Sequence, residues 1–351
     1  MIETRLMFSL GILEHFINNS LDLSYENKEI TGFELVVPLM EASSHYTYVE
    51  TVSDKADTLY RRIKESLTSM MTYSYLNYIK RVSAKLELNK EDVILAFDYT
   101  DEDFYGDVQG VDIHGWTGKD AVTGHFKFLT CSIIGKNAPY KIPLISIPIR
   151  MGHIKSQTIL YCISQIKDYV GKIRLLLFDK QFIDNDLMYE LTQHKYQFLM
   201  LGKRTKENVW FFKQLEEEKT ILVKEYKVNK NFSTYDGENY VIFLKGIFDP
   251  RSEKNLDWIF ITNSEKVALG QLIKEYKQRW GIEIQFKIED EALIKCKSKE
   301  MKVRYFLFLF EQMLHVQWAC FYKEDFSFKE FLIAMAKMSR KWAKTEDKQC
   351  S

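Results

Sequence analysis

Four polar side chains between residues 276 and 287 share one face if this segment is a helix. At about 100° per residue they lie within roughly 80° of one another. They are Tyr276, Arg279, Glu283 and Lys287. The face combines an aromatic hydroxyl, two cations and a carboxylate, which makes it a candidate for catalysis. A solvated helix surface with an ordinary i,i+4 pair is the alternative interpretation.

Two aspartates far upstream follow apolar runs that are typical of buried strands. Asp98 follows residues 93–97, and Asp179 follows residues 173–178. The carboxyl ends of strands in an open α/β sheet are where ligands tend to bind. We therefore predict that Asp98, Asp179 and Glu283 form one catalytic site. Capping of the next turn is the alternative role for both aspartates.

An acidic segment after the first of these strands could supply the first acid of the site instead. An acidic turn that forms a solvated loop is the simpler interpretation, because Asp98 alone directly ends the apolar run and Gly106 and Gly110 suit a loop. The acids of this segment are Asp101, Glu102, Asp103 and Asp107.

The chain is long and apolar enough to bury a large core. It has 351 residues, of which 46% are hydrophobic and 14% aromatic. Lys plus Arg and Asp plus Glu both number 49, so any phosphate-binding surface must be a local patch. The cysteines are scattered without metal-ligand spacing, and no secretory or membrane-spanning pattern is found, which predicts a cytoplasmic protein.

Hydrophobic periodicity predicts an α/β fold that follows a helical N-terminal region. In that region Asp54 is the candidate cap of one helix that continues to Ile79. The expected strands are 93–98, 125–134, 142–149, 173–178 and 197–201 and, in a later β-rich block, 209–212, 220–228, 240–248 and 256–262. The other expected helices are 155–170, 184–194, 276–287, 301–322 and 326–342.

Together these features resemble the DDE transposases of bacterial and archaeal insertion sequences. The phrase Leu177-Phe-Asp179-Lys-Gln-Phe182 looks like the second-aspartate motif of that family. Phe97-Asp98 followed by Phe104-Tyr105-Gly106 resembles its first motif. Tyr276-x-x-Arg279-x-x-x-Glu283 after a β insertion is similar to the signature of the Tyr-Arg-Glu-Lys subgroup. The resemblance covers about residues 90–322.

The resemblance implies a ribonuclease-H-like mixed sheet with flanking helices, and two Mg²⁺ ions, which Mn²⁺ can replace. In-line attack on a phosphodiester needs cations on the entering and the departing oxygen, and Mg²⁺ prefers oxygen ligands. Asp98 is the expected shared ligand, and Asp179 and Glu283 each complete one metal site. Contacts to the DNA backbone are expected from Tyr276, Arg279, Lys287, Lys203 and Arg204.

The sequence departs from the family pattern at one position. The signature lysine would lie seven residues after Glu283, where this chain has Asp290. Lys287, one turn closer to Glu283, is the candidate replacement. In the β insertion, Trp210 and Trp258 could stack on an unpaired base, whereas packing within a half-buried strand is the favoured role for Trp258.

These expectations divide the chain into a helical region with possible DNA contacts, two parts of the core separated by a β-strand insertion, and a C-terminal helix and tail. The boundaries are 1–90, 91–202, 203–265, 266–322 and 323–351. The resemblance implies a transposase that cleaves double-stranded DNA at element ends and transfers the 3′-hydroxyl to target DNA, as a homodimer associated with the nucleoid. Two other interpretations stay open: a catalytically inactive, repurposed DNA-binding protein, and a metal-dependent nuclease that joins no strands.

Overall fold

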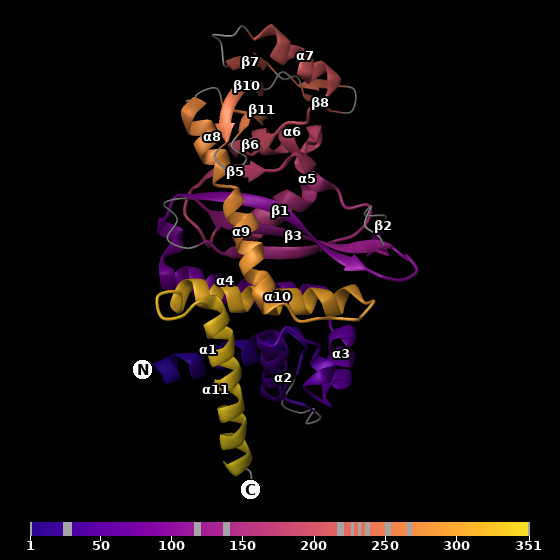
Figure 1. The fold of residues 1–351 in the computed structure, drawn as a ribbon, viewed down its shortest axis with the longest axis vertical. Helices are drawn as coiled ribbons and strands as arrows, with labels where there is room; N and C mark the ends of the chain where they lie inside the picture. Colours follow the sequence, from indigo (N-terminus) through magenta and orange to yellow (C-terminus); the bar gives the residue numbers. More distant parts are fainter. Residues whose placement is uncertain are drawn as a thin grey trace.

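One large mixed sheet forms the centre of the molecule (Figure 1). β1 (Val93–Phe104) pairs antiparallel with β3 (Gly124–Ile134), and β3 pairs antiparallel with β4 (Pro143–Ile149). On its other side β1 runs parallel to β5 (Ile173–Phe178), and β5 runs parallel to β6 (Phe198–Leu201). The order β4-β3-β1-β5-β6 is the arrangement expected of a ribonuclease-H-like sheet.

The computed structural model describes most of the chain. The described residues are 2–23, 30–115, 121–135, 141–215, 221–225, 228–230, 233–235, 239–249, 254–264 and 269–349.

Three strands of the β-rich region extend the sheet beyond β6. β11 (Lys254–Thr262) pairs antiparallel with β6, β10 (Tyr240–Asp249) with β11, and β7 (Ile221–Glu225) with β10. A separate hairpin joins β8 (Val228–Lys230) and β9 (Ser233–Tyr235). The β-rich region therefore continues the central sheet and lies at one end of the elongated molecule (Figure 1).

Helices cover both faces of the sheet. The face with the larger hydrophobic core packs against α4 (Thr68–Leu86), α5 (Lys155–Ile166) and α10 (Met301–Phe321). The opposite face packs a smaller cluster under α8 (Leu269–Lys277) and α9 (Trp280–Glu289). Because strand side chains alternate between faces, each strand contributes to both cores.

The N-terminal helices and the last helix form a further layer beneath α4 and α10 (Figure 1). None of the helices in the described ranges is long and apolar enough to cross a bilayer. The remaining elements are α1 (Ile2–Ser20), α2 (Gly32–Ser44), α3 (Ala56–Glu65), α6 (Asn185–Gln193), α7 (Lys206–Gln214), α11 (Phe328–Gln349), the short strand β2 (His114–Gly115) beside β3, and the short 3₁₀ turns Val49–Thr51, Leu88–Lys90, Lys180–Phe182 and Asp290–Ala292.

The single helix expected to run from a cap at Asp54 to Ile79 is wrong. The segment forms α3 and α4, with Lys55 at the N-cap position of α3. Ser66 ends α3 with an extended backbone (φ −74°, ψ 158°), and its hydroxyl donates to the Arg62 carbonyl at 2.8 Å. A serine hydroxyl that bonds back to the helix backbone competes with helix continuation. Hydrophobic periodicity alone does not detect such a break.

The strand expected at residues 209–212 is also wrong, because these residues lie within α7. Short apolar runs fit a buried strand and a buried helix turn equally well, so only packing decides between them. Here Phe211 and Phe212 pack on Phe243 of β10, with ring centroids 5.1 and 5.5 Å apart. The neighbouring Trp210 is 54% exposed.

The acidic turn expected at residues 101–107 begins later than predicted, because β1 continues to Phe104. The antiparallel register places Asp101 opposite Lys127 of β3, and Lys127 Nζ lies 2.6 Å from the Asp101 carboxylate. Arg304 of α10 pairs with Glu102 at 3.2 Å. Cross-strand and helix-to-strand pairing therefore stabilises an acidic sequence as a strand.

Candidate active site

The register between β1 and β5 sets Asp98 and Asp179 at the same level of the sheet. Phe97 pairs with Phe178, and the parallel pairing ends there. The next residue on each strand is an aspartate. β1 continues only against β3, where Asp98 lies opposite Thr130.

The alternation of side chains directs both aspartates to the face that carries α8 and α9. On β1, Ile94 and Ala96 belong to the cluster under these helices, and Leu175 and Leu177 of β5 belong to the same cluster. Asp98 is the next residue of the β1 series. Asp179 is the next of the β5 series and keeps an extended backbone (φ −77°, ψ 167°). The two-residue period thus places both carboxylates on the side of the Glu283 helix.

The single helix expected at residues 276–287 is wrong. Tyr276 lies at the end of α8, and Glu283 lies in α9, which begins at Trp280. The Arg279 amide donates to the Tyr276 carbonyl, and the Ile282 amide to the Arg279 carbonyl, both at 2.9 Å. These i to i−3 bonds tighten the chain by comparison with an α-helix. The junction brings Arg279 to the start of α9, one turn before Glu283.

The Arg279 guanidinium joins two of the three predicted acids. Its Nη1 lies 3.1 Å from Asp98 Oδ2 and its Nη2 lies 2.5 Å from Glu283 Oε1. The side chains of Arg279 and Asp98 are 8% and 14% exposed, whereas that of Glu283 is 42% exposed. The planar fork of arginine suits simultaneous pairing with two carboxylates.

Burial and the neighbouring charges both affect the pKa of Asp98. Burial raises the pKa of Asp98 to about 6, and the Arg279 guanidinium and a hydrogen bond from the Tyr99 amide oppose this rise. The negative charges of Asp179 and Glu283 raise the pKa of Asp98 further. A raised carboxyl pKa in a group of like charges is typical of a functional site.

Tyr276 lies in the core rather than at the surface. It is 2% exposed and packs against Trp258 and Phe260, with centroids 6.0 and 5.0 Å away. Burial raises the pKa of its phenol. Lys287 is exposed in the last turn of α9, and Asp290 is exposed in the 3₁₀ turn that follows. The packing role favoured for Trp258 agrees with its 8% exposure.

Lys203 and Arg204 line an open cleft of about 650 Å³ next to Asp179, together with Lys180 and Trp258. The cleft lies between the carboxyl ends of β5 and β6 and the strand β11. Arg204 Nη2 donates to the Asp257 carbonyl at 2.7 Å. Three cations, Lys180, Lys203 and Arg204, therefore line a cleft beside the predicted site, together with Asp257.

Sequence reasoning missed two lysines at or near this cleft. Lys180 directly follows Asp179 and lines the cleft. Lys155, at the start of α5, donates from Nζ to the Gln181 carbonyl at 2.7 Å. Burial and the nearby Lys203 lower the pKa of Lys155. The adjacency of Lys180 to Asp179 could have signalled the first lysine, whereas only the fold reveals the second.

The donor chemistry of the site suits a hard divalent cation, because all three predicted ligands are carboxylates. The spacing in this conformation does not, since no group of three or more His, Cys, Asp or Glu side chains in the described ranges could hold a metal ion. Arg279 occupies the position between Asp98 and Glu283. Of the rival acids, Asp101 and Glu102 are neutralised elsewhere by Lys127 and Arg304.

Residues 155–309 match the family model described as Transposase DDE domain. The matched range contains Asp179, Arg279 and Glu283, and Asp98 lies before it. No curated protein matches the chain.

A solved structure with a similar fold is that of the piggyBac transposase in a synaptic complex with hairpin DNA, determined by cryo-EM. The similarity covers 95% of this chain and 79% of that one, with a TM-score of 0.56 and 12% sequence identity. The α/β fold expected from the sequence, with a ribonuclease-H-like mixed sheet, flanking helices and a helical N-terminal region, is confirmed. The family match supports a DDE transposase domain.

Proposed function

We propose that this protein is a DDE transposase that cleaves DNA strands at element ends and transfers the 3′-hydroxyl to target DNA. One observation carries the proposal: the β1–β5 register aligns Asp98 with Asp179 on the sheet face covered by the Glu283 helix. The match of residues 155–309 to the Transposase DDE domain supports the same reaction class.

In this proposal Asp98, Asp179 and Glu283 would hold two Mg²⁺ or Mn²⁺ ions. When bound, these ions lower the pKa of the attacking water or 3′-hydroxyl and neutralise the departing oxygen. Arg279 bridges Asp98 and Glu283 in the arrangement seen here, so the guanidinium must leave at least one of them before both can serve as ligands. Released from Asp98, it is positioned to bind a DNA phosphate.

The cleft beside Asp179 would guide the DNA backbone toward the carboxylates. Lys203 and Arg204 supply its positive charge together with Lys180, and phosphate contacts of this kind bind DNA without reading its sequence. Lys287 is exposed on the Glu283 helix and takes the role expected of the signature lysine. Tyr276 acts from its buried position by supporting Arg279, whose guanidinium carbon lies 5.7 Å from the tyrosine ring centre. The active species is a homodimer that bridges two DNA ends.

The test uses a plasmid that carries the coding sequence and its flanking DNA. With Mg²⁺ the protein should cut at the element ends on either side of the coding sequence and release the DNA between them. It should then join the 3′ ends of this DNA to a second plasmid. Asp98→Asn, Asp179→Asn and Glu283→Gln should each abolish both products, because each removes one anionic metal ligand. Asp101→Asn is the matched control, since this acid pairs with Lys127 instead, and it should retain activity.

Binding of the metal gives an independent readout. Calorimetric titration with Mg²⁺ should show binding to the intact protein and to Asp101→Asn, and weaker binding to Asp98→Asn. If the three variants that replace a carboxylate by an amide cleave and join DNA as well as the intact protein, the proposal is wrong. Cleavage of the plasmid without joining, even when pre-cleaved 3′-hydroxyl ends are supplied, identifies a hydrolytic nuclease.

A catalytically inactive DNA-binding protein is the second candidate. It is favoured by the Arg279 bridge, which neutralises two of the carboxylates and separates them by a guanidinium. This candidate predicts DNA binding that is unaffected by Asp98→Asn and by Mg²⁺, with no cleavage under any condition. The plasmid assay and the Mg²⁺ titration together separate the two candidates.

A further inference from the structure

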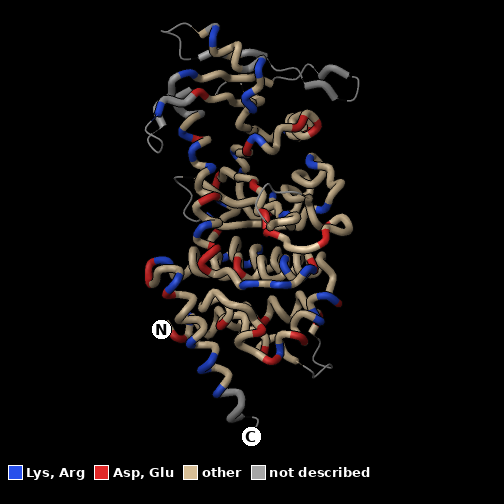
Figure 2. The backbone as a smooth tube through the Cα atoms, turned by 45° about the vertical axis from the view of Figure 1, so that its right-hand side comes forward, with Lys and Arg blue, Asp and Glu red and all other residues tan. Residues whose placement is uncertain are grey.

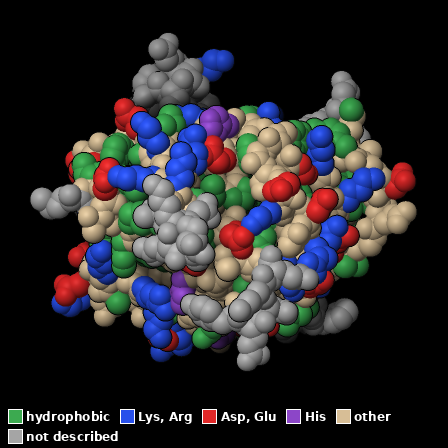
Figure 3. Space-filling view, turned by 90° about the horizontal axis from the view of Figure 1, so that it is seen from below, with side chains coloured by type: hydrophobic (Ala, Val, Ile, Leu, Met, Phe, Trp, Pro, Cys, Tyr) green, Lys and Arg blue, Asp and Glu red, His purple; other side chains and the backbone are tan. Residues whose placement is uncertain are grey.

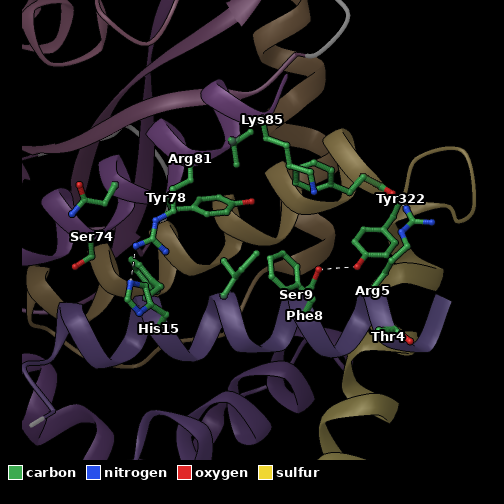
Figure 4. Close-up of a pocket in the computed structure, with 15 residues that line it drawn as sticks. Thr4, Arg5, Phe8, Ser9, His15, Ser74, Tyr78, Arg81, Lys85 and Tyr322 are labelled. Atoms are coloured by element: carbon green, nitrogen blue, oxygen red, sulfur yellow. Dashed lines mark hydrogen bonds between the residues drawn. The ribbon is translucent and has the colours of Figure 1, made fainter. Parts of the chain in front are cut away.

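A cavity of about 450 Å³ lies between α1, α4 and the end of α10, on the opposite side of the sheet from α9 (Figure 4). This volume falls in the range of small-molecule sites. The residues that line it include cations and aromatic rings, and none of the described lining residues is an aspartate or glutamate. The local charge is distinctive, because acids and bases are interspersed along the described chain as a whole (Figure 2) and on the helical end of the molecule (Figure 3).

Two cations line the cavity on either side of Tyr78, Arg81 toward His15 and Lys85 toward Phe321 (Figure 4). Arg81 and Lys85 lie one turn apart on α4, a spacing at which like charges repel. Among the described residues, neither cation forms an ion pair with a carboxylate. Arg81 Nη2 donates to His15 Nε2 at 3.3 Å, and burial and the Arg81 charge lower the pKa of His15, so this partner is neutral. Within the described ranges, no carboxylate therefore compensates the charge of either cation.

The hydroxyl of Tyr78 points into the cavity from the same face of α4 (Figure 4). The tyrosine is 6% exposed, and its hydroxyl has no hydrogen-bond partner among the described residues. A buried polar group without a partner is costly, so it is seldom kept without a ligand or water to satisfy it. The nearby Ser9 and Tyr322 hydroxyls differ, because they bond to each other at 2.8 Å.

Aromatic rings form the walls next to these polar groups. Phe8 is 66% exposed at the rim, and Lys85 Nζ lies 4.4 Å from the ring centre of Phe321. Arg5 lies 4.7 Å from the ring centre of Tyr322. Such surfaces suit a flat ring, which can stack on an aromatic face and lie against a guanidinium.

We propose that this cavity binds a nucleotide, with the phosphate on Arg81 and Lys85 and the base among the aromatic rings. The Tyr78 hydroxyl donates to a ring nitrogen or carbonyl oxygen of the base, a bond that an acyl chain could not accept. The nucleotide comes either from free mononucleotide or from an unpaired nucleotide of DNA, which presents the same chemistry. The assignment does not depend on strand cleavage at Asp98 and Asp179.

The first experiment measures binding of dAMP to the full chain by calorimetry. Arg81→Met should weaken binding about tenfold, the loss expected for one charge-assisted phosphate contact. Tyr78→Phe should weaken it roughly three- to tenfold while leaving the free protein at least as stable, because the removed hydroxyl bonds to none of the described residues. Lys80→Met, an exposed neighbour on α4 outside the cavity, is the matched control and should bind dAMP normally.

Two ligands lacking one half of the nucleotide complete this experiment. Ribose 5-phosphate has no base and decanoate has no ring, so both should bind much more weakly than dAMP. Failure of dAMP to bind overturns the proposal, as does binding that Arg81→Met and Tyr78→Phe leave unchanged. Equal binding of decanoate and dAMP also overturns it, since the cavity would then accept any anion with an apolar body.

The second experiment separates the two sources of the nucleotide. A DNA duplex with one extrahelical nucleotide should bind more tightly than the fully paired duplex, and Tyr78→Phe should remove this difference, if the cavity takes a nucleotide from DNA. Equal binding of the two duplexes, with dAMP binding retained, assigns the cavity to free nucleotides. Asp98→Asn should alter neither result, so failure of the proposed strand cleavage leaves this test intact.

Discussion

Replacement of Glu289 by glutamine should change how the stability of the protein depends on pH. Glu289 is 4% exposed near the end of α9, where its Oε1 accepts a hydrogen bond from Gln285 Nε2 at 2.7 Å and lies 3.4 Å from His315 Nδ1 of α10. Burial raises the pKa of Glu289 to about 8 and lowers the pKa of His315 to about 3. The pair resembles an ion pair by distance, but these shifts make both partners neutral at pH 7.

The sign of the effect follows from the proton that Glu289 holds in the folded state. Between its ordinary pKa of 4.5 and about 8, the folded protein keeps this proton and the unfolded chain has lost it. The free energy of unfolding therefore falls as pH rises through this window and levels off above it. The difference between the two pKa values corresponds to about 5 kcal/mol across the whole window. Glutamine does not titrate, so Glu289→Gln lacks this term.

Urea unfolding of the intact protein and of Glu289→Gln from pH 5 to pH 8.5 tests this reasoning. The free energy of unfolding of the intact protein, relative to that of the variant, should fall by several kcal/mol as pH rises. The largest possible change is about 5 kcal/mol. Glu324→Gln, at an exposed position, is the control and should follow the intact protein. A pH-independent difference between the intact protein and Glu289→Gln would refute the neutral carboxyl at α9.

Two further predictions concern the site and the packing of the core. Arg279→Met should lower the free energy of unfolding by about 3 kcal/mol at pH 8, because it leaves the buried Asp98 charge unpaired. The loss should be smaller at pH 5, where protonation neutralises Asp98. Urea titrations should show the loss, and adding Asp98→Asn should restore most of the stability. Gly171→Ala should destabilise by about 1–3 kcal/mol, since its Cβ would lie 2.3 Å from the Glu91 carbonyl oxygen. Gly11→Ala in α1 should stabilise by about 0.5–1 kcal/mol, since its Cβ would meet no described atom within 4 Å beyond its own helix backbone and chain neighbours. Thermal unfolding of the two glycine variants compares them directly, and equal changes in Tm would contradict the close approach at Gly171.

Local sequence patterns predicted many of the strands and helices of the fold. The apolar runs before Asp98 and Asp179 predict two buried strands, because strand identity depends on residue type and a period of two. The same period, once the strands are aligned, accounts for the shared face of the two aspartates. The break at Ser66 and the helix at residues 206–214 were missed, because a hydroxyl competing for one carbonyl and the packing of two phenylalanines leave no periodic signal.

The amino-acid sequence by itself determined which residues are candidates for the site: two strand-end aspartates and a helix that carries Arg279 and Glu283. Only the tertiary structure decided that Arg279 bridges Asp98 and Glu283, that Tyr276 is buried, and that β1 continues through an acidic segment. The reason is physical. Hydrophobic periodicity reflects whether each residue of a helix or strand faces the core or the solvent. Asp98 and Arg279 are 181 positions apart, and only strand register and helix packing bring them together.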